Sequence, residues 1–215
     1  MKKAKNAVSG GAGLSQEEVG NGLKEALNAG VGKAVDFLSA EDGYYKSAYK
    51  ILLPEEAKKV TDKLKGVPGF SDAEEKLIER LNRAAEDAAK KAKPIFVSAI
   101  KQMTFKDAMD ILMGNKDAAT RYLERSTSTQ LFNEFLPVIQ TSLDKVNART
   151  YWRSVVKAHN KLPLVKKVNP ELDEYVTSNA LEGMFQLVEK KELDIRDNQS
   201  SRTSDLMKKV FAKQD

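Results

Sequence analysis

Hydrophobic residues recur three and four residues apart along almost the whole chain, and no other pattern in the sequence limits the fold as strongly. On an α-helix such residues share one face, whereas a half-buried β-strand needs strict alternation of apolar and polar residues. Only the short stretches KILL (50–53) and PLVKKV (163–168) could pair as strands. The helical spacing is clearest in the first periodic segment, at Val19, Leu23, Leu27, Val31, Val35 and Leu38. The sequence therefore predicts an all-α fold.

Capping residues indicate where several of the helices begin. Ser15 and Glu18 have the spacing of a capping box, in which each residue binds a backbone N–H group of the other. Thr104 predicts a second helix start, and Ser201 or Thr203 predicts the start of the last helix. With the periodic segments between them, these signals predict about seven to nine helices.

Prolines and short polar stretches predict where helices bend or stop. Pro94 should kink or restart the helix that begins near residue 71, because proline lacks the N–H group that an inner helical position needs. The stretch STS at 126–128 predicts a restart, and Pro137 predicts a further interruption. Asn169-Pro170-Glu171 predicts the start of a helix that runs to about residue 196.

We predict that these helices form one compact domain over residues 14–215, with a glycine-rich flexible leader at residues 1–13. The sequence contains no internal repeat and no clear linker that would divide it. The helix over 170–196 should be the most buried, because its hydrophobic residues go most of the way round it. These residues are Val176, Ala180, Leu181, Met184, Phe185, Leu187 and Val188.

The chain has no cysteine and a single histidine, His159. Disulfides, thiolate nucleophiles, zinc–thiolate sites and iron–sulfur clusters are thereby excluded, as are Cys–His pairs. We predict no metal and no cofactor, and an enzyme of this composition would depend on carboxylates, lysine or tyrosine. No apolar run approaches the roughly 20 residues of a spanning helix, so we expect no transmembrane segment in this chain.

The stretch DKVNARTYWRSVVKAHNKL (144–162) is predicted to form one amphipathic helix with a basic row on one side. Trp152 and its apolar neighbours fall on the opposite arc, which predicts that they pack inward and that the row is solvated. The row is a candidate surface for weak binding of anions, but nucleic acid is not an expected partner, because stacking on bases would need the rings outside. The row consists of Lys145, Arg149, Arg153, Lys157 and Lys161.

The stretch KPIFVSAIKQMTFKDAMDIL (93–112) contains the strongest candidate ligand site. Polar groups that converge on an apolar pocket are typical of small-molecule sites. The alternative, which we favour, is structural: Phe96 and Met103 belong to the core, Lys101 is solvated, and Asp107 completes the Thr104 cap. The candidate ligand-binding residues are Lys93, Phe96, Lys101, Gln102, Met103 and Asp107.

Several longer stretches resemble a known family. LPEEAKKV (53–60), AKPIFVSAIKQMTFKDAMDILMGNKDAATRYLERSTSTQL (92–131) and LDEYVTSNALEGMFQLVEKKELDIRDNQSSRTSDLMKKVF (172–211) are similar to the bacterial family called domain of unknown function 4197. The resemblance implies an exported protein of the periplasm or cell envelope, often held at the membrane by an N-terminal lipid anchor. It implies no catalytic residues, because the activity of the family is not established.

The sequence and the family resemblance leave three hypotheses of function. The first, which we favour, is a non-catalytic helical protein of the cell envelope that binds a small ligand, a lipid or a protein partner. The second is a carboxylate-based hydrolase with a cavity near the helix that Pro94 breaks. The third is a weak binder of anionic surfaces or nucleic acid through the basic row.

Overall fold

The computed structural model describes residues 14–64, 72–161, 163–164, 167 and 169–212. In these residues the chain forms nine α-helices, one short 3-10 helix and no strand, which confirms the predicted all-α fold. The helices are α1 (Gln16–Leu38), α2 (Glu55–Leu64), α3 (Ala73–Ala89), α4 (Ala92–Gln102), α5 (Phe105–Leu112), α6 (Ala118–Asp144), α7 (Ala148–His159), α8 (Leu172–Asp197), the 3-10 helix η1 (Gln199–Ser201) and α9 (Asp205–Phe211).

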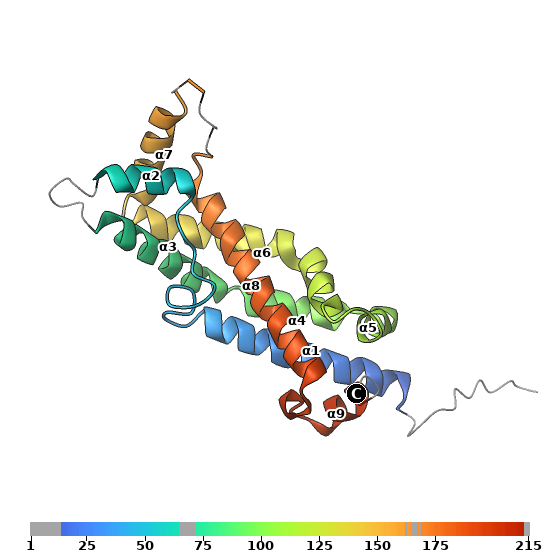
Figure 1. Ribbon diagram of the computed structural model, residues 1–215. Helices are drawn as coiled ribbons and strands as arrows, with labels where there is room; N and C mark the ends of the chain where they lie inside the picture. Colours follow the sequence, from blue (N-terminus) through green and yellow to red (C-terminus); the bar gives the residue numbers. More distant parts are fainter. Residues whose placement is uncertain (1–13, 65–71, 162, 165–166, 168, 213–215) are drawn as a thin grey trace, which may run out of the picture.

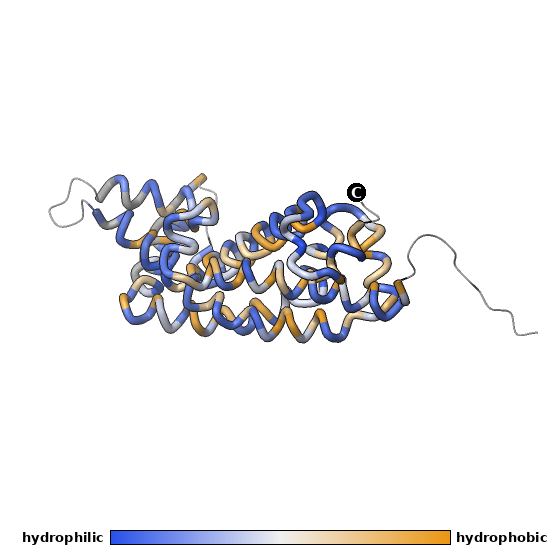
Figure 2. The backbone as a smooth tube through the Cα atoms, turned by 90° about the horizontal axis from the view of Figure 1, so that it is seen from below, coloured by the Kyte–Doolittle hydropathy of each residue, from blue (hydrophilic) through white to orange (hydrophobic). Residues whose placement is uncertain are grey.

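The long helices lie side by side and give the molecule an elongated shape (Figures 1 and 2). α8 packs on α1, α3 and α6, and α4 packs on α1 and α6. α2 and α7 lie at one end of this bundle, and α5 and α9 lie at the other (Figure 1). Within the described residues, no helix combines enough length with enough hydrophobicity to span a membrane.

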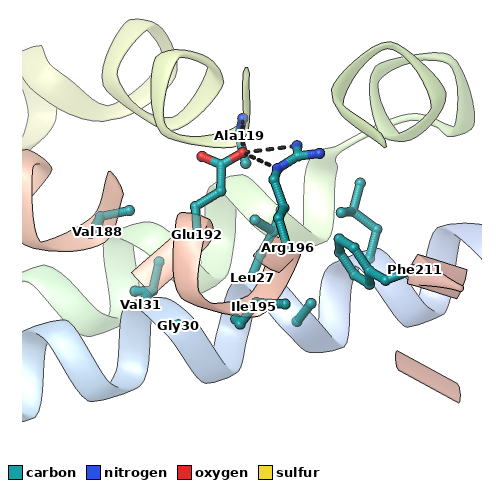
Figure 3. Close-up of a pocket in the computed structure, with 11 residues that line it drawn as sticks. Leu27, Gly30, Val31, Ala119, Val188, Glu192, Ile195, Arg196 and Phe211 are labelled. Carbon is teal, nitrogen blue, oxygen red and sulfur yellow. Dashed lines mark hydrogen bonds and ion pairs between the residues drawn. The ribbon is translucent and has the colours of Figure 1, made fainter. Parts of the chain in front are cut away.

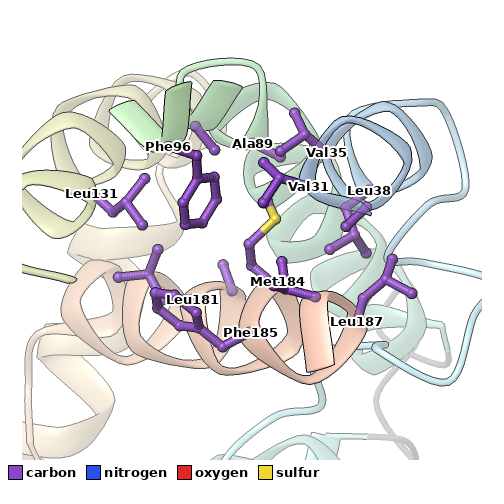
Figure 4. Packing of buried hydrophobic residues seen from close by; sticks show 14 of the residues in the cluster. Val31, Val35, Leu38, Ala89, Phe96, Leu131, Leu181, Met184, Phe185 and Leu187 are labelled. Atoms are coloured by element: carbon purple, nitrogen blue, oxygen red, sulfur yellow. The ribbon is translucent and has the colours of Figure 1, made fainter. Parts of the chain in front are cut away.

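α8 is buried around most of its circumference, as predicted for this segment. Fourteen of its 26 residues are buried, and they include all seven hydrophobic residues that were expected to cover it. Met184 has no exposed surface and points toward Val31 of α1 (Figure 4). The neighbours α1, α3 and α6 therefore leave α8 only a narrow strip of surface.

A single cluster of buried hydrophobic residues extends through the bundle. Phe96 of α4 and Phe185 of α8 meet edge to face near Leu131 of α6, with their ring centroids 5.9 Å apart (Figure 4). One continuous core is what a single domain requires. The domain boundary at residue 14 stays a prediction, and the predicted flexible leader lies outside the described residues.

The predicted caps of α1 and α5 are both present. Ser15 and Glu18 form a complete capping box, and so do Thr104 and Asp107. In each box the hydroxyl accepts the N–H group three residues on, and the carboxylate accepts the N–H group of the capping residue. Each box thus satisfies two N–H groups that have no partner inside the helix. Pro94 lies in the first turn of α4, so the helix restarts there as expected.

The interruptions predicted within residues 118–144 are wrong, because α6 runs unbroken from Ala118 to Asp144. The hydroxyls of Thr127 and Ser128 each donate to the carbonyl four residues back, at 2.6 Å, so the STS stretch fits a helix. Pro137 is exposed, and so is Asn133, whose carbonyl would otherwise accept the missing N–H. Water can hydrate that carbonyl, which makes the proline tolerable on this side of the helix.

The helix predicted over 144–162 begins later. α6 ends at Asp144, and Asn147 adopts a left-handed backbone conformation (φ 54°) before α7 starts at Ala148. Asparagine tolerates this conformation better than most residues. Lys145 is consequently the C-cap of α6 and does not belong to α7. The prediction of one continuous basic row is therefore wrong at its first member.

The last helix also begins later than predicted. The hydroxyl of Ser204 accepts the N–H group of Met207 at 3.1 Å and caps α9. Ser201 instead lies in η1 and donates to the Asp194 carboxylate at 2.7 Å. The prediction that Ser201 or Thr203 caps this helix is wrong, because the 3-10 turn places the start further along the chain.

Candidate functional site

The six predicted ligand-binding residues divide between the core and the surface. Phe96 and Met103 are buried, with 0% and 3% of their surface exposed. Lys93 is exposed and pairs with Asp36 of α1, with 3.2 Å between Nζ and Oδ1. Gln102 is also exposed, and its side chain donates to the hydroxyl of Ser98 one turn earlier. These four side chains do not converge.

The other two predicted residues have contacts of their own. Lys101 is exposed, and its backbone carbonyl accepts a hydrogen bond from Nζ of Lys24 at 3.2 Å. Asp107 forms the capping box with Thr104. The structure thus does not bring the six predicted residues around a common cavity. Their contacts consist of core packing, a helix cap, an ion pair and hydrogen bonds.

Several carboxyl groups in the described residues have pKa values below their ordinary range. In each case the main cause is hydrogen bonding to the ionised form: Glu18, Asp42, Asp72, Glu75, Asp107 and Asp194. A general acid that works near neutral pH needs a carboxyl group with a raised pKa. These six groups therefore act as ionised acceptors.

Among all the described residues, no three His, Asp or Glu side chains are grouped so that they could hold a metal ion.

Charged side chains of α8 are buried against the ends of two other helices (Figure 3). The Glu192 carboxylate accepts the backbone N–H groups of Ala119 (3.0 Å) and Thr120 (2.8 Å) at the start of α6. Arg196 pairs with Glu192 at 2.9 Å and donates to the carbonyl of Ile111 at the end of α5. A negative group at a helix N-terminus and a positive group at a C-terminus are both stabilised by the helix dipoles.

Arg202 makes a similar contact at the end of α8. It is 2% exposed and donates to the carbonyls of Ile195 (3.0 Å) and Arg196 (2.8 Å). Sequence reasoning did not identify this buried charged cluster of Glu192, Arg196 and Arg202. One signal was available: Glu192 and Arg196 follow Val188 at intervals of four, on the buried face of the helix.

A small apolar cavity lies beside the buried charged cluster, between α1 and α8 (Figure 3). Leu27 and Val31 line it from α1, Ile195 lines it from α8, and Phe211 lines it from α9. Its volume of about 20 Å³ holds no more than about one water molecule. The cavity is therefore too small for a lipid or a metabolite, and we assign this region to the stability of the fold.

A much larger hollow follows the seam between α6 and α8, and we call it the α6–α8 groove. Its volume is about 560 Å³, within the range of ligand-binding clefts. Phe132 from α6 and Leu181 and Phe185 from α8 contribute its apolar surface. Ser128 and Ser178 lie along the same seam. The groove therefore combines an apolar floor with polar edges.

The charged residues of the α6–α8 groove are mainly acidic. Glu124, Glu182 and Glu189 contribute three carboxylates, and Arg121 contributes the single positive charge. Arg121 forms ion pairs with Glu124 (2.6 Å), with Glu189 and with Asp117 (3.1 Å). Glu182 is exposed and lies two helical turns from Glu189. The groove thus carries a net negative charge beside its apolar floor.

The basic row is only partly a solvated face. Lys145, Lys157 and Lys161 are exposed. Arg149 pairs with Asp144 (2.8 Å) and with the buried Asp173 (3.4 Å). The solvated-row prediction is therefore wrong for Arg149, whose side chain is 16% exposed. It fails because the tertiary fold places Asp173 against this position.

Arg153 and Trp152 are neighbours in sequence and lie on different sides of α7, one exposed and one buried. Arg153 pairs with Glu171, while Trp152 is buried and donates to the backbone carbonyl of Asn169 at 3.3 Å. The inward orientation expected for Trp152 is confirmed. Tyr151, Val155 and His159 fall on the same arc as Trp152 in a helical projection of the sequence, and their side chains lie outside the part of the chain that is described.

We expect Arg149→Gln to lower the free energy of unfolding by about 1–3 kcal/mol, because it removes a charged partner from the buried carboxylate of Asp173. Lys157→Gln removes the same charge from an exposed position of α7 and should change it by less than about 0.5 kcal/mol. Urea unfolding followed by circular dichroism measures both values. Equal effects of the two changes would show that Arg149 is no more than a surface charge.

Comparisons with known proteins agree with the resemblance found in the sequence. A family described as "Protein of unknown function (DUF4197)" matches residues 13–212, which is nearly the whole chain. No curated protein and no solved structure matches the chain significantly. With a match of this extent, the chain belongs to the DUF4197 family.

Proposed function

We propose that this protein is a non-catalytic binding protein of the bacterial cell envelope, and that the α6–α8 groove holds an amphipathic helical segment of a partner protein. The cell-envelope location rests on the family resemblance alone. The observation that carries the binding function is the groove itself, with its apolar floor of Phe132, Leu181 and Phe185 and its acidic edges. Helices commonly bind in grooves by laying an apolar face on such a floor.

The dimensions of the groove suit a short helix. On α6 the groove extends from Arg121 to Phe132, and on α8 it extends from Ser178 to Glu189. Eleven residue steps at about 1.5 Å each give a length of about 16 Å, or three helical turns. An amphipathic helix presents two or three apolar side chains over that length. A lipid tail would need an enclosed apolar cavity, and the cavity beside the buried charged cluster measures only about 20 Å³.

The charge of the groove indicates the chemistry of the partner. Glu124, Glu182 and Glu189 outnumber Arg121, so lysine or arginine beside the apolar stripe of the partner would be attracted to the groove. Complementary charge raises the association rate and disfavours acidic competitors. The proposed partner segment is therefore a basic amphipathic helix.

A synthetic helical peptide tests this proposal. The probe has leucines at helical spacing on one face and lysines beside them, and a scrambled peptide of the same composition lacks the apolar face. We expect the probe to bind the protein, measured by fluorescence anisotropy, and the scrambled peptide to bind at least tenfold more weakly. Glu182→Lys should weaken binding of the probe at least tenfold, about 1.4 kcal/mol, because it places a like charge in the groove.

Glu25→Lys is the matched control, since Glu25 is an exposed glutamate of α1 outside the groove. It makes the same charge change and should leave binding within about twofold of wild type. Equal binding of the probe and the scrambled peptide, or equal losses with Glu25→Lys and Glu182→Lys, would mean that only overall charge is being sensed. Either result would overturn the proposed function.

A further inference from the structure

Arg121 lies where two surface hollows meet. It lines the α6–α8 groove, and it also lines a second hollow of about 310 Å³ between α5 and α6, which we call the α5–α6 hollow. Asp107 and Asp110 of α5 line this second hollow, together with Asp117. Arg121 is therefore close to acidic residues of both the groove and the α5–α6 hollow.

The contacts of Arg121 link the two helices across this junction. Asp117 is the N-cap residue of α6, one turn before Arg121; Glu124 lies one turn after it on α6, and Glu189 lies on α8. The side chain of Arg121 remains 43% exposed, so these ion pairs are in contact with water. Exposed ion pairs are weak and are exchanged readily for other pairs. A cation from a partner could therefore replace Arg121 at Glu124 and Glu189.

The same contacts leave Glu182 as the carboxylate of the groove that Arg121 does not bind. Glu182 and Glu189 are seven residues apart on α8, about 10 Å along the helix. A partner helix with one basic residue meets a complementary charge at Glu182. A second basic residue two turns away meets the Glu189 carboxylate, which is already paired with Arg121.

We propose that Arg121 determines the specificity of the α6–α8 groove by competing with the partner for Glu124 and Glu189. This inference rests on the proposed function. Arg121 restricts the preferred partner to a helix with a basic residue at the Glu182 end and an uncharged residue at the Arg121 end.

Two probe peptides that differ at one position test this role. Both are amphipathic helices with a lysine placed to pair with Glu182 of the protein. Seven residues from that lysine, the first peptide has glutamine and the second has a further lysine. We expect the wild-type protein to bind the first peptide at least threefold more tightly than the second, because Arg121 already pairs with Glu124 and Glu189. Arg121→Gln should tighten binding of the second peptide at least fivefold and change binding of the first by less than twofold, because two carboxylates lose their internal partner.

Arg125→Gln is the matched control. Arg125 is an exposed arginine one turn further along α6 that lines the α5–α6 hollow but not the groove. It should not change the preference between the peptides. Arg121→Lys keeps the charge but lacks the planar guanidinium group that can bind three carboxylates at once. It should therefore give part of the gain in affinity for the second peptide. It also tests the inference if Arg121→Gln does not fold, as judged by thermal melting.

The outcomes separate this inference from the proposed function. Equal gains with Arg121→Gln and Arg125→Gln would show a general charge effect and overturn the role of Arg121. Weaker binding of both peptides to Arg121→Gln would show that Arg121 attracts the partner, which also overturns it. If neither peptide binds wild type or any variant, the proposed function itself fails.

Discussion

Glu192→Ala is expected to lower the free energy of unfolding by about 3–5 kcal/mol, the cost of breaking a buried ion pair by removing one partner. The change leaves Arg196 buried without its carboxylate and deprives the N–H groups of Ala119 and Thr120 of their acceptor. Glu192 is 8% exposed, so water compensates little for these losses. The start of α6 would lose the hydrogen bonds that join it to Glu192 of α8.

Guanidinium-induced unfolding measures this effect, and two other changes control for it. Glu182→Ala alters an exposed glutamate of the same helix and should cost less than about 0.5 kcal/mol. Glu192→Gln retains one oxygen that can accept an N–H group, so its cost should lie between the other two. A loss below about 1 kcal/mol for Glu192→Ala would show that the buried charged cluster does not stabilise the fold.

Phe185→Ala is expected to lower the free energy of unfolding by about 3–5 kcal/mol, because it leaves a cavity where α4, α6 and α8 pack together beneath the α6–α8 groove. The ring is 6% exposed and packs edge to face on Phe96, which is completely buried. Figure 4 shows both rings among side chains of α4, α6 and α8. The surrounding helices are packed on one another and can close such a cavity only partly.

The control is Phe105→Ala, which removes the same ring from a position that is 40% exposed. We expect a loss of less than about 1.5 kcal/mol there, since a large part of that residue stays in contact with water and its removal leaves no enclosed cavity. Unfolding in urea compares the two variants, with the dependence of the free energy of unfolding on urea concentration (the m-value) taken as the same for both. Similar losses for both would mean that the packing around Phe185 is loose.

Sequence reasoning succeeded where one helical segment contains all the information. The hydrophobic residues of 170–196 surround their helix, and that pattern alone showed that α8 is buried on most sides. The capping boxes at Ser15 and Thr104 were equally local, since the partners are three residues apart. Local signals failed at Pro137, which lies on the exposed side of α6, and at the STS stretch, where hydroxyls bond to carbonyls of the same helix.

The candidate site depends on residues that are far apart in the chain. The α6–α8 groove joins Phe132 to Phe185, and no spacing within either helix indicates that the two line one hollow. The six residues chosen around Pro94 were neighbours in sequence, and the fold divides them between core and surface. Sequence proximity was therefore a poor guide to the site, because a helix directs consecutive side chains to different sides.

The sequence by itself determined that this protein is all-helical and which face of α8 is buried, because helical spacing and caps depend on residues within one or two turns. Only the tertiary structure decided which charges are buried and which are solvated. Arg149 lies beside Asp173, and Glu192 lies at the start of α6, because separate helices pack together there. A buried charged residue needs polar partners, and the sequence of one helix does not show those that another element supplies.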